Sequence, residues 1–168
     1  MTIKTFIMTC GLAVCLLAQP AAAGAFEDGQ AAYDKGDYGT ALGNWLPLAE
    51  QGNAWTQLYL GFMYINGQGV PQDDAEALKW FRKAADQGNA YALGNLGVTY
   101  ENGNGAMLDY VKSYMWWKLA AANSPPSETK IHDVAATNLA RIAAMMTPEQ
   151  IAEARRLARE WLAAHDKK

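Results

Sequence analysis

The sequence contains few of the residues that hold small secreted domains together or that build metal sites. Its 168 residues include only two cysteines and two histidines. Both cysteines, Cys10 and Cys15, lie near the N-terminus, inside a segment that we expect to be removed. The mature chain would then have no disulfide, no thiolate nucleophile and no cysteine ligand for a metal, so packing alone must stabilise it.

The chain also has no large excess of charge of one sign. Fourteen Lys and Arg residues stand against seventeen Asp and Glu residues, which gives a formal charge of −3. Binding to nucleic acid or to an anionic membrane surface generally depends on a basic excess, so we expect neither partner.

The longest apolar run is also short. Phe6–Ala18 is interrupted only by Thr9, and it is too short to span a membrane comfortably. Lys4 precedes the run and the small residues 21–23 follow it, which is the pattern of a secretory signal peptide. We expect cleavage after Ala23, with cleavage after Ala25 as the alternative. Loss of residues 1–23 removes one lysine and no acidic residue, so the formal charge becomes −4.

Two other interpretations of this N-terminal segment exist. It could stay uncleaved as an anchor, or Cys15 could carry a lipid, since Leu12-Ala13-Val14-Cys15 resembles a lipid-attachment site. Val14 is bulky for such a site, and the apolar run ahead of it is short. We therefore expect a cleaved, exported protein that is periplasmic, with secretion as the alternative and no stable membrane insertion after cleavage.

The remaining sequence is dominated by a 36-residue unit, residues 53–88, that is repeated without a gap as residues 89–124. Twelve aligned positions are identical, whereas unrelated segments of ordinary composition would share roughly two or three. A fixed period of this length indicates an array of structural repeats. The identical pairs are Asn53/Asn89, Ala54/Ala90, Leu60/Leu96, Gly61/Gly97, Tyr64/Tyr100, Asn66/Asn102, Gly67/Gly103, Gly69/Gly105, Asp73/Asp109, Trp80/Trp116, Ala84/Ala120 and Ala85/Ala121.

Each unit has the pattern of a helix, a turn and a second helix. Asn53 is a good N-cap for the first helix, and Gly67 is a typical left-handed stop. Pro71 prevents the first helix from continuing, and a second helix is predicted over residues 73–87. Its apolar stripe includes Trp80, so Trp116 of the next unit should be core as well. Gly61 costs helix stability at mid-helix, which suggests that another helix approaches closely there.

The flanking segments extend this array. Residues 26–52 have the pattern of an incomplete first repeat, with a short helix that ends at Gly36 and a second helix over residues 37–51 that Pro47 should kink. After residue 124 we expect a helix over residues 128–145. Thr147 and Gln150 then form a capping-box start for a final helix that runs to His165. Residues 125–165 would thus be a capping hairpin, which an open stack needs.

The turn and the helix ends carry a family resemblance. Leu60-Gly61-x-x-Tyr64-x-x-Gly67-x-Gly69-Val70-x-x-Asp73, followed by Trp80-Phe81-x-Lys83-Ala84-Ala85, is similar to the Sel-one-like repeat, a relative of the tetratricopeptide repeat. The second copy departs from it, with Ala106-Met107 in place of Val70-Pro71. The resemblance implies an all-α fold, a right-handed α-solenoid of about four stacked antiparallel helix hairpins. It is closest to the branch of the family that lacks cysteines.

The resemblance also implies where a partner would bind. In stacked hairpins of this type the first helices line a concave groove that holds a protein or peptide. By alignment with tetratricopeptide repeats, ten residues should point there: Trp55, Leu58, Phe62, Ile65, Asn66, Tyr91, Gly94, Val98, Glu101 and Asn102. Exposed aromatic residues are typical anchors for a partner, but Trp55 and Tyr91 could instead seal the joints between hairpins.

No arrangement of residues for catalysis is visible. His132-Asp133 is adjacent in sequence, so its side chains would not face each other on a helix. No metal-binding helix motif, nucleophile elbow or phosphate loop is present, and we expect no catalytic residue, cofactor or metal. The sequence favours a non-enzymatic scaffold or adaptor of the bacterial envelope. The alternatives are an envelope hydrolase for cell-wall or β-lactam substrates, to which some cysteine-rich relatives are linked, and a purely structural envelope protein.

Overall fold

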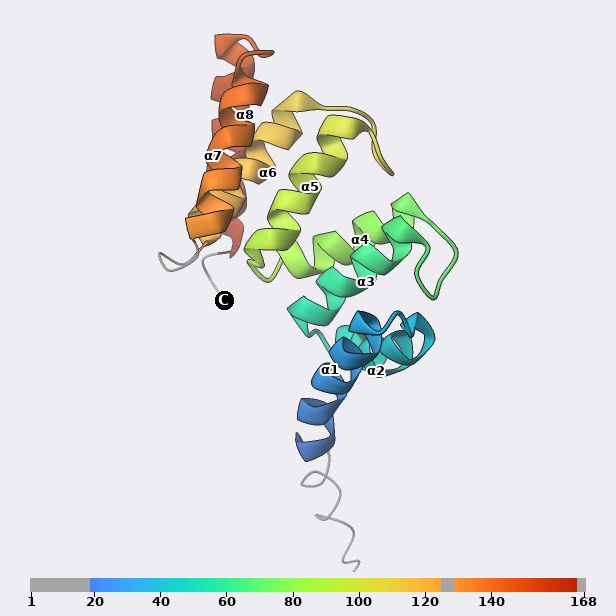
Figure 1. The fold of residues 1–168 in the computed structure, drawn as a ribbon. Helices are drawn as coiled ribbons and strands as arrows, with labels where there is room; N and C mark the ends of the chain where they lie inside the picture. Colours follow the sequence, from blue (N-terminus) through green and yellow to red (C-terminus); the bar gives the residue numbers. More distant parts are fainter. Residues whose placement is uncertain (1–18, 125–128, 166–168) are drawn as a thin grey trace, which may run out of the picture.

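The computed structural model describes residues 19–124 and 129–165, and every regular element in those ranges is an α-helix. Figure 1 shows them as successive pairs stacked in chain order. The predicted all-α solenoid of four hairpins is thus confirmed. The helices are α1 (Gln19–Asp34), α2 (Tyr38–Glu50), α3 (Ala54–Asn66), α4 (Asp74–Ala85), α5 (Ala90–Asn102), α6 (Tyr110–Asn123), α7 (Thr129–Ala143) and α8 (Pro148–His165).

The two repeated units begin their helices with the same side chains. Asn53 and Asn89 accept hydrogen bonds from backbone N–H groups in the first turns of α3 and α5, at 3.0 Å. Asp73 and Asp109 do the same for α4 and α6, at 2.9 Å. Because these donors have no partner within the helix, the caps fix where each helix starts.

The turn inside each unit keeps its shape although its sequence changes. Gly67 and Gly103 end the first helices in the left-handed conformation, with φ of 64° and 76°. The second glycine of each turn, Gly69 or Gly105, also has positive φ and lies against the preceding unit. A Cβ on Gly105 would lie 2.4 Å from the carbonyl oxygen of Asp74, at the start of α4. The turn is therefore also the point where one unit rests on the previous one.

A glycine of the first helix lets an aromatic ring of the second helix close each of the first three hairpins. A Cβ on Gly61 would lie 2.3 Å from the ring of Phe81, and one on Gly97 would lie 2.7 Å from Trp117. The close approach predicted from Gly61 is thus confirmed. Gly29 has the same relation to Trp45 at 2.3 Å, which the sequence did not lead us to expect.

The buried side chains form two adjoining clusters. One surrounds Trp45 between α1, α2 and α3 and includes Trp80, whereas the larger one extends from α3 to α8. Trp116 and Trp117 are 3% and 4% exposed, so both belong to the core as predicted. Helix α3 contributes to both clusters, since Leu58 belongs to one and Leu60 to the other.

The last pair of helices packs differently from the first three. Helix α8 packs chiefly on α6, and α7 also packs on α6, so the two have little direct contact with each other. The capping box that starts α8 is present: the N–H of Thr147 donates to the Gln150 side chain, and the N–H of Gln150 donates to the Thr147 hydroxyl. This pair forms an open cap on the array.

The N-terminal helix starts earlier than expected. Helix α1 begins at Gln19, ahead of the predicted cleavage point after Ala23, and α2 continues through Pro47 to Glu50. The signal peptide predicted for residues 1–23 lies mostly outside the described residues and stays a prediction. Among the described helices, none has both the length and the apolar character needed to cross a bilayer.

Candidate functional site

The predicted groove residues lie on α3 and α5, the first helices of the two repeated units. Trp55, in the first turn of α3, and Tyr91, in the first turn of α5, contact each other across the joint between the hairpins. Their ring centroids are 5.7 Å apart and the rings are tilted by 46°. Trp55 is still 45% exposed, and Tyr91 is half-buried. The pair therefore bridges two units and also presents aromatic surface to solvent.

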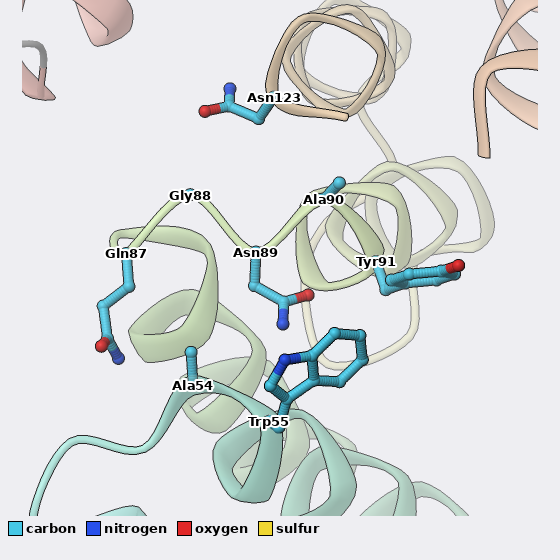
Figure 2. A pocket seen from close by; sticks show the side chains of 8 residues that line it. All are labelled: Ala54, Trp55, Gln87, Gly88, Asn89, Ala90, Tyr91 and Asn123. Carbon is cyan, nitrogen blue, oxygen red and sulfur yellow. The ribbon is translucent and has the colours of Figure 1, made fainter. Parts of the chain in front are cut away.

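A cavity of about 250 Å³ lies beside this aromatic pair, where the loop from α4 enters α5. Figure 2 shows Trp55 and Tyr91 on one side of it and Asn123, from the end of α6, on the other. The polar groups at the cavity are neutral: they come from Gln87, Asn89 and Asn123. Such a site can hold an uncharged polar group next to an aromatic surface.

A second, more apolar pocket of about 180 Å³ continues from the other side of Tyr91. Val98 of α5 and Val134 of α7 are 39% and 40% exposed at its rim, and Trp117 and Ile131 lie beneath it. Large apolar side chains that are exposed next to one another are a mark of interaction sites. We call Trp55, Tyr91, Val98 and Val134 the first-helix surface.

Glu101, at the end of α5, is engaged by a residue of α7. Both carboxylate oxygens of Glu101 accept hydrogen bonds from the guanidinium of Arg141, and the Glu101 side chain is only 14% exposed. The hydrogen bond to Glu101 raises the pKa of Arg141 above its ordinary value. Glu101 therefore adds little exposed negative charge beside the first-helix surface.

Leu58 is not part of a groove, which corrects the prediction made for it. Its side chain is only 3% exposed and belongs to the larger core cluster. Phe62 and Ile65 are half-buried and pack against the same cluster, and Phe62 makes an edge contact with Phe81 at 5.4 Å. Because the face of α3 that turns towards α5 is buried in the joint, these three residues mainly hold the hairpins together.

The remaining predicted residues lie at the ends of the helices or below the pocket. Asn66 and Asn102 are exposed at the C-terminal ends of α3 and α5, and Gly94 is buried under the apolar pocket beside Trp117.

Helix α7 also contributes to this site, which its sequence did not lead us to expect. Lys130, Ile131 and Val134 line the apolar pocket together with α5. One feature of the sequence does point to it. Val134 is apolar but lies off the buried stripe that Ile131, Ala135 and Ile142 form along α7, which indicates an exposed apolar position.

The described residues contain no group of three or more His, Cys, Asp or Glu side chains that could hold a metal ion. His165 stacks on Trp161 with a centroid distance of 3.8 Å and is within 2.8 Å of its carbonyl oxygen through Nδ1. This histidine is held as part of the packing of α8.

Comparison with known proteins identifies the class of repeat that this chain contains. The chain is an α-solenoid of helix hairpins, and the Sel1 repeat family matches it twice, at residues 56–89 and 90–125. These ranges coincide with the two repeated units to within a few residues. The chain therefore contains two Sel1 repeats.

Two solved structures support this assignment. A protective antigen of uropathogenic Escherichia coli with an SLR fold superimposes on 86% of this chain with a TM-score of 0.77 and 25% identity. A Sel1 repeat protein from Oxalobacter formigenes covers 66% of the chain with a TM-score of 0.58 and 34% identity. This chain spans only 30% and 47% of those two proteins, and no curated protein sequence matches it. Sel1-repeat proteins generally act as scaffolds for protein interactions and are generally not enzymes.

Proposed function

We propose that this protein is a non-enzymatic scaffold that binds a peptide segment of a partner protein on its first-helix surface. The observation that carries the proposal is the continuous apolar strip on the outside of three successive hairpins. Tyr91 contacts Trp55 on one side and shares the apolar pocket with Val98 and Val134 on the other. An exposed tryptophan and a half-buried tyrosine in such a strip are typical energetic anchors of an interface.

The pocket defines what the partner must supply. About 180 Å³ of apolar space fits one medium-sized apolar side chain, such as leucine or methionine. Asn95, at the pocket, donates to the carbonyl oxygen of Tyr91 at 2.8 Å, while its side-chain oxygen accepts from no described residue. That oxygen is placed to accept a hydrogen bond from a backbone N–H of the bound segment.

The proposed location is the bacterial envelope. It rests on the signal-peptide pattern of residues 1–23, and the resemblance to envelope adaptors of the family supports it. The periplasm is the first choice and secretion is the alternative. The E. coli relative is described as a protective antigen, which is consistent with a protein that leaves the cytoplasm.

A pull-down from an envelope extract of the source bacterium tests the binding surface. The bait pair is the natural protein and the Trp55→Ala/Tyr91→Ala variant, and captured proteins are identified by mass spectrometry. Replacing two central aromatic anchors should weaken binding about 30-fold or more, so the partner should be captured by the natural protein only.

The Met107→Ala/Leu108→Ala variant is a matched control, because it removes two apolar side chains that are 89% and 54% exposed on the turn before α6. Circular dichroism should show all three proteins folded. If the control variant loses the same partners as the aromatic variant, or if neither loses any, the first-helix surface is not the binding site.

A further inference from the structure

A separate cavity of about 240 Å³ lies between α4, α6 and α8, the second helices of three successive pairs. It shares no residue with the first-helix surface. Helix α8 closes it with Leu157 and Trp161, and the Trp161 ring makes a T-shaped contact with Trp116, 6.0 Å between centroids. Since the family matches end at residue 125, this cavity depends on the part of the chain outside the two Sel1 repeats.

The cation at this cavity has no anionic partner. Nη2 of Arg82 donates to the hydroxyl of Tyr100 at 2.8 Å, and the guanidinium lies 5.4 Å from the ring centroid of Trp116. Both neighbours are neutral, and no described carboxylate forms an ion pair with Arg82. A guanidinium has five N–H groups arranged in a fork, so most of them stay available.

One further donor lines the same space. The hydroxyl of Tyr100 accepts from Arg82, so its own hydrogen can be donated elsewhere.

The charges around the cavity favour an anion at Arg82. Lys112 lies at the edge, 3.2 Å from the carboxylate of Asp109, and is largely neutralised by it. Asp86 is the one carboxylate that lines the cavity, and it lies 3.7 Å from Nε2 of His165. A ligand cation would compete with Arg82 for the face of Trp116, whereas a ligand carboxylate would meet the donors of Arg82 and Tyr100 there.

The geometry points to this cavity as a binding site for a small carboxylate that carries an apolar group. The carboxylate pairs with Arg82 and accepts from the hydroxyl of Tyr100, in charge-assisted hydrogen bonds. The apolar group packs against Met115, Leu157 and Trp161. The volume lies just below the range of about 300–1,000 Å³ for drug-sized ligands, so the site fits a compact molecule.

Isothermal titration calorimetry of the purified protein with sodium 3-phenylpropanoate tests the site, with 3-phenylpropanamide as the neutral probe. A ligand of this size should bind the natural protein with a dissociation constant of about 1 mM. Loss of the charge on the amide should weaken binding about tenfold or more. Arg82→Gln should have an effect of the same size.

Arg155→Gln is the matched control, because Arg155 is an exposed arginine of α8 that does not line the cavity. The Trp55→Ala/Tyr91→Ala variant should keep full affinity, which separates this site from the proposed peptide surface. No saturable heat with the carboxylate, equal affinity for the amide, or equal affinity of Arg82→Gln and Arg155→Gln would each overturn the proposal. Circular dichroism of Arg82→Gln confirms that a loss of binding is not a loss of folding.

Discussion

The first three hairpins and the last helix pair bury the apolar faces of their helices in different ways. In each of the first three, a glycine of the first helix admits an aromatic ring of the second, as with Gly61 and Phe81. Helices α7 and α8 have no such glycine–ring contact, and both pack on α6 instead. A ring closes each of the first three hairpins, whereas the last pair brings α8 beside α4 and α6 and encloses a cavity there.

This difference separates the two kinds of surface in the molecule. The repeated units supply a regular array whose outer face carries the first-helix surface. The open pair supplies a cavity that the repeats by themselves do not have. In a solenoid each unit packs mainly on its neighbours, so a change in the last pair should be felt chiefly in the third hairpin.

Filling the glycine contact of a closed hairpin should have the largest effect on stability. Gly61→Ala places a methyl group 2.3 Å from the ring of Phe81, so the helices must move apart. Overpacking of this kind costs about 3 kcal/mol, although alanine is the better helix former by about 1 kcal/mol. Chemical denaturation followed by circular dichroism measures the change.

Gly43→Ala provides the control for this prediction. Gly43 lies within α2, is exposed, and has nothing within 4 Å of the position of an added Cβ. It should therefore stabilise the protein by about 0.5–1 kcal/mol. If Gly61→Ala also stabilises the protein, the ring contact does not close the hairpin.

A polar group under α8 should loosen the open pair and leave the closed hairpins intact. Ala158 is 2% exposed on α8, and Ala158→Asn buries an amide without a partner, which costs about 2 kcal/mol. Hydrogen exchange measured by mass spectrometry should become faster in residues 148–165 and stay unchanged in residues 54–85. Ala152→Asn, at an exposed position of α8, is the control. Equal acceleration along the whole chain would show that the array unfolds as one unit.

The two kinds of region also differ in how far the sequence predicts them. The identical positions of the two units predicted the helices, the cap at Asn53 and the core position of Trp116, because these features depend on local chemistry and on the period. The second glycine of each turn kept its conformation although its neighbours changed. Local rules therefore determine most of the fold.

The site was harder to predict because it depends on contacts between units. Leu58 has the spacing of a groove residue, yet α3 packs into two core clusters and buries it. Glu101 meets Arg141 across 40 positions of sequence, and Val134 joins the pocket only because α7 lies beside α5. Alignment with a repeat family gives the position of a residue within its own unit, and it does not give its neighbours from a non-repeated helix.

The ion pair between α5 and α7 links a closed hairpin to the open pair and should have a smaller effect. Arg141 is half exposed, so Arg141→Gln should cost about 0.5–1 kcal/mol. The cost should shrink as salt is added, because exposed charges are screened. Urea denaturation at low and at high salt measures it. Arg159→Gln, on the exposed side of α8, should show neither effect, and a salt-independent loss for Arg141→Gln would exclude an electrostatic link.

The smallest effect concerns the pH dependence of a helix cap in the first closed hairpin. Hydrogen bonds from Thr40 lower the pKa of Asp37 below its ordinary value of 3.8. The charged cap therefore contributes stability above that value, and the contribution is lost as the pH falls through the lower pKa of the folded state. Asp37→Asn keeps a good capping side chain that does not titrate. Its Tm should match that of the natural protein at neutral pH and fall less steeply in acid.

Glu149 in the first turn of α8 also has a lowered pKa, so Glu149→Gln applies the same measurement to the open pair. If the first hairpin and the last pair unfold independently, each variant changes the acid response of its own helices only, and a shared response would show that the closed and open regions are coupled.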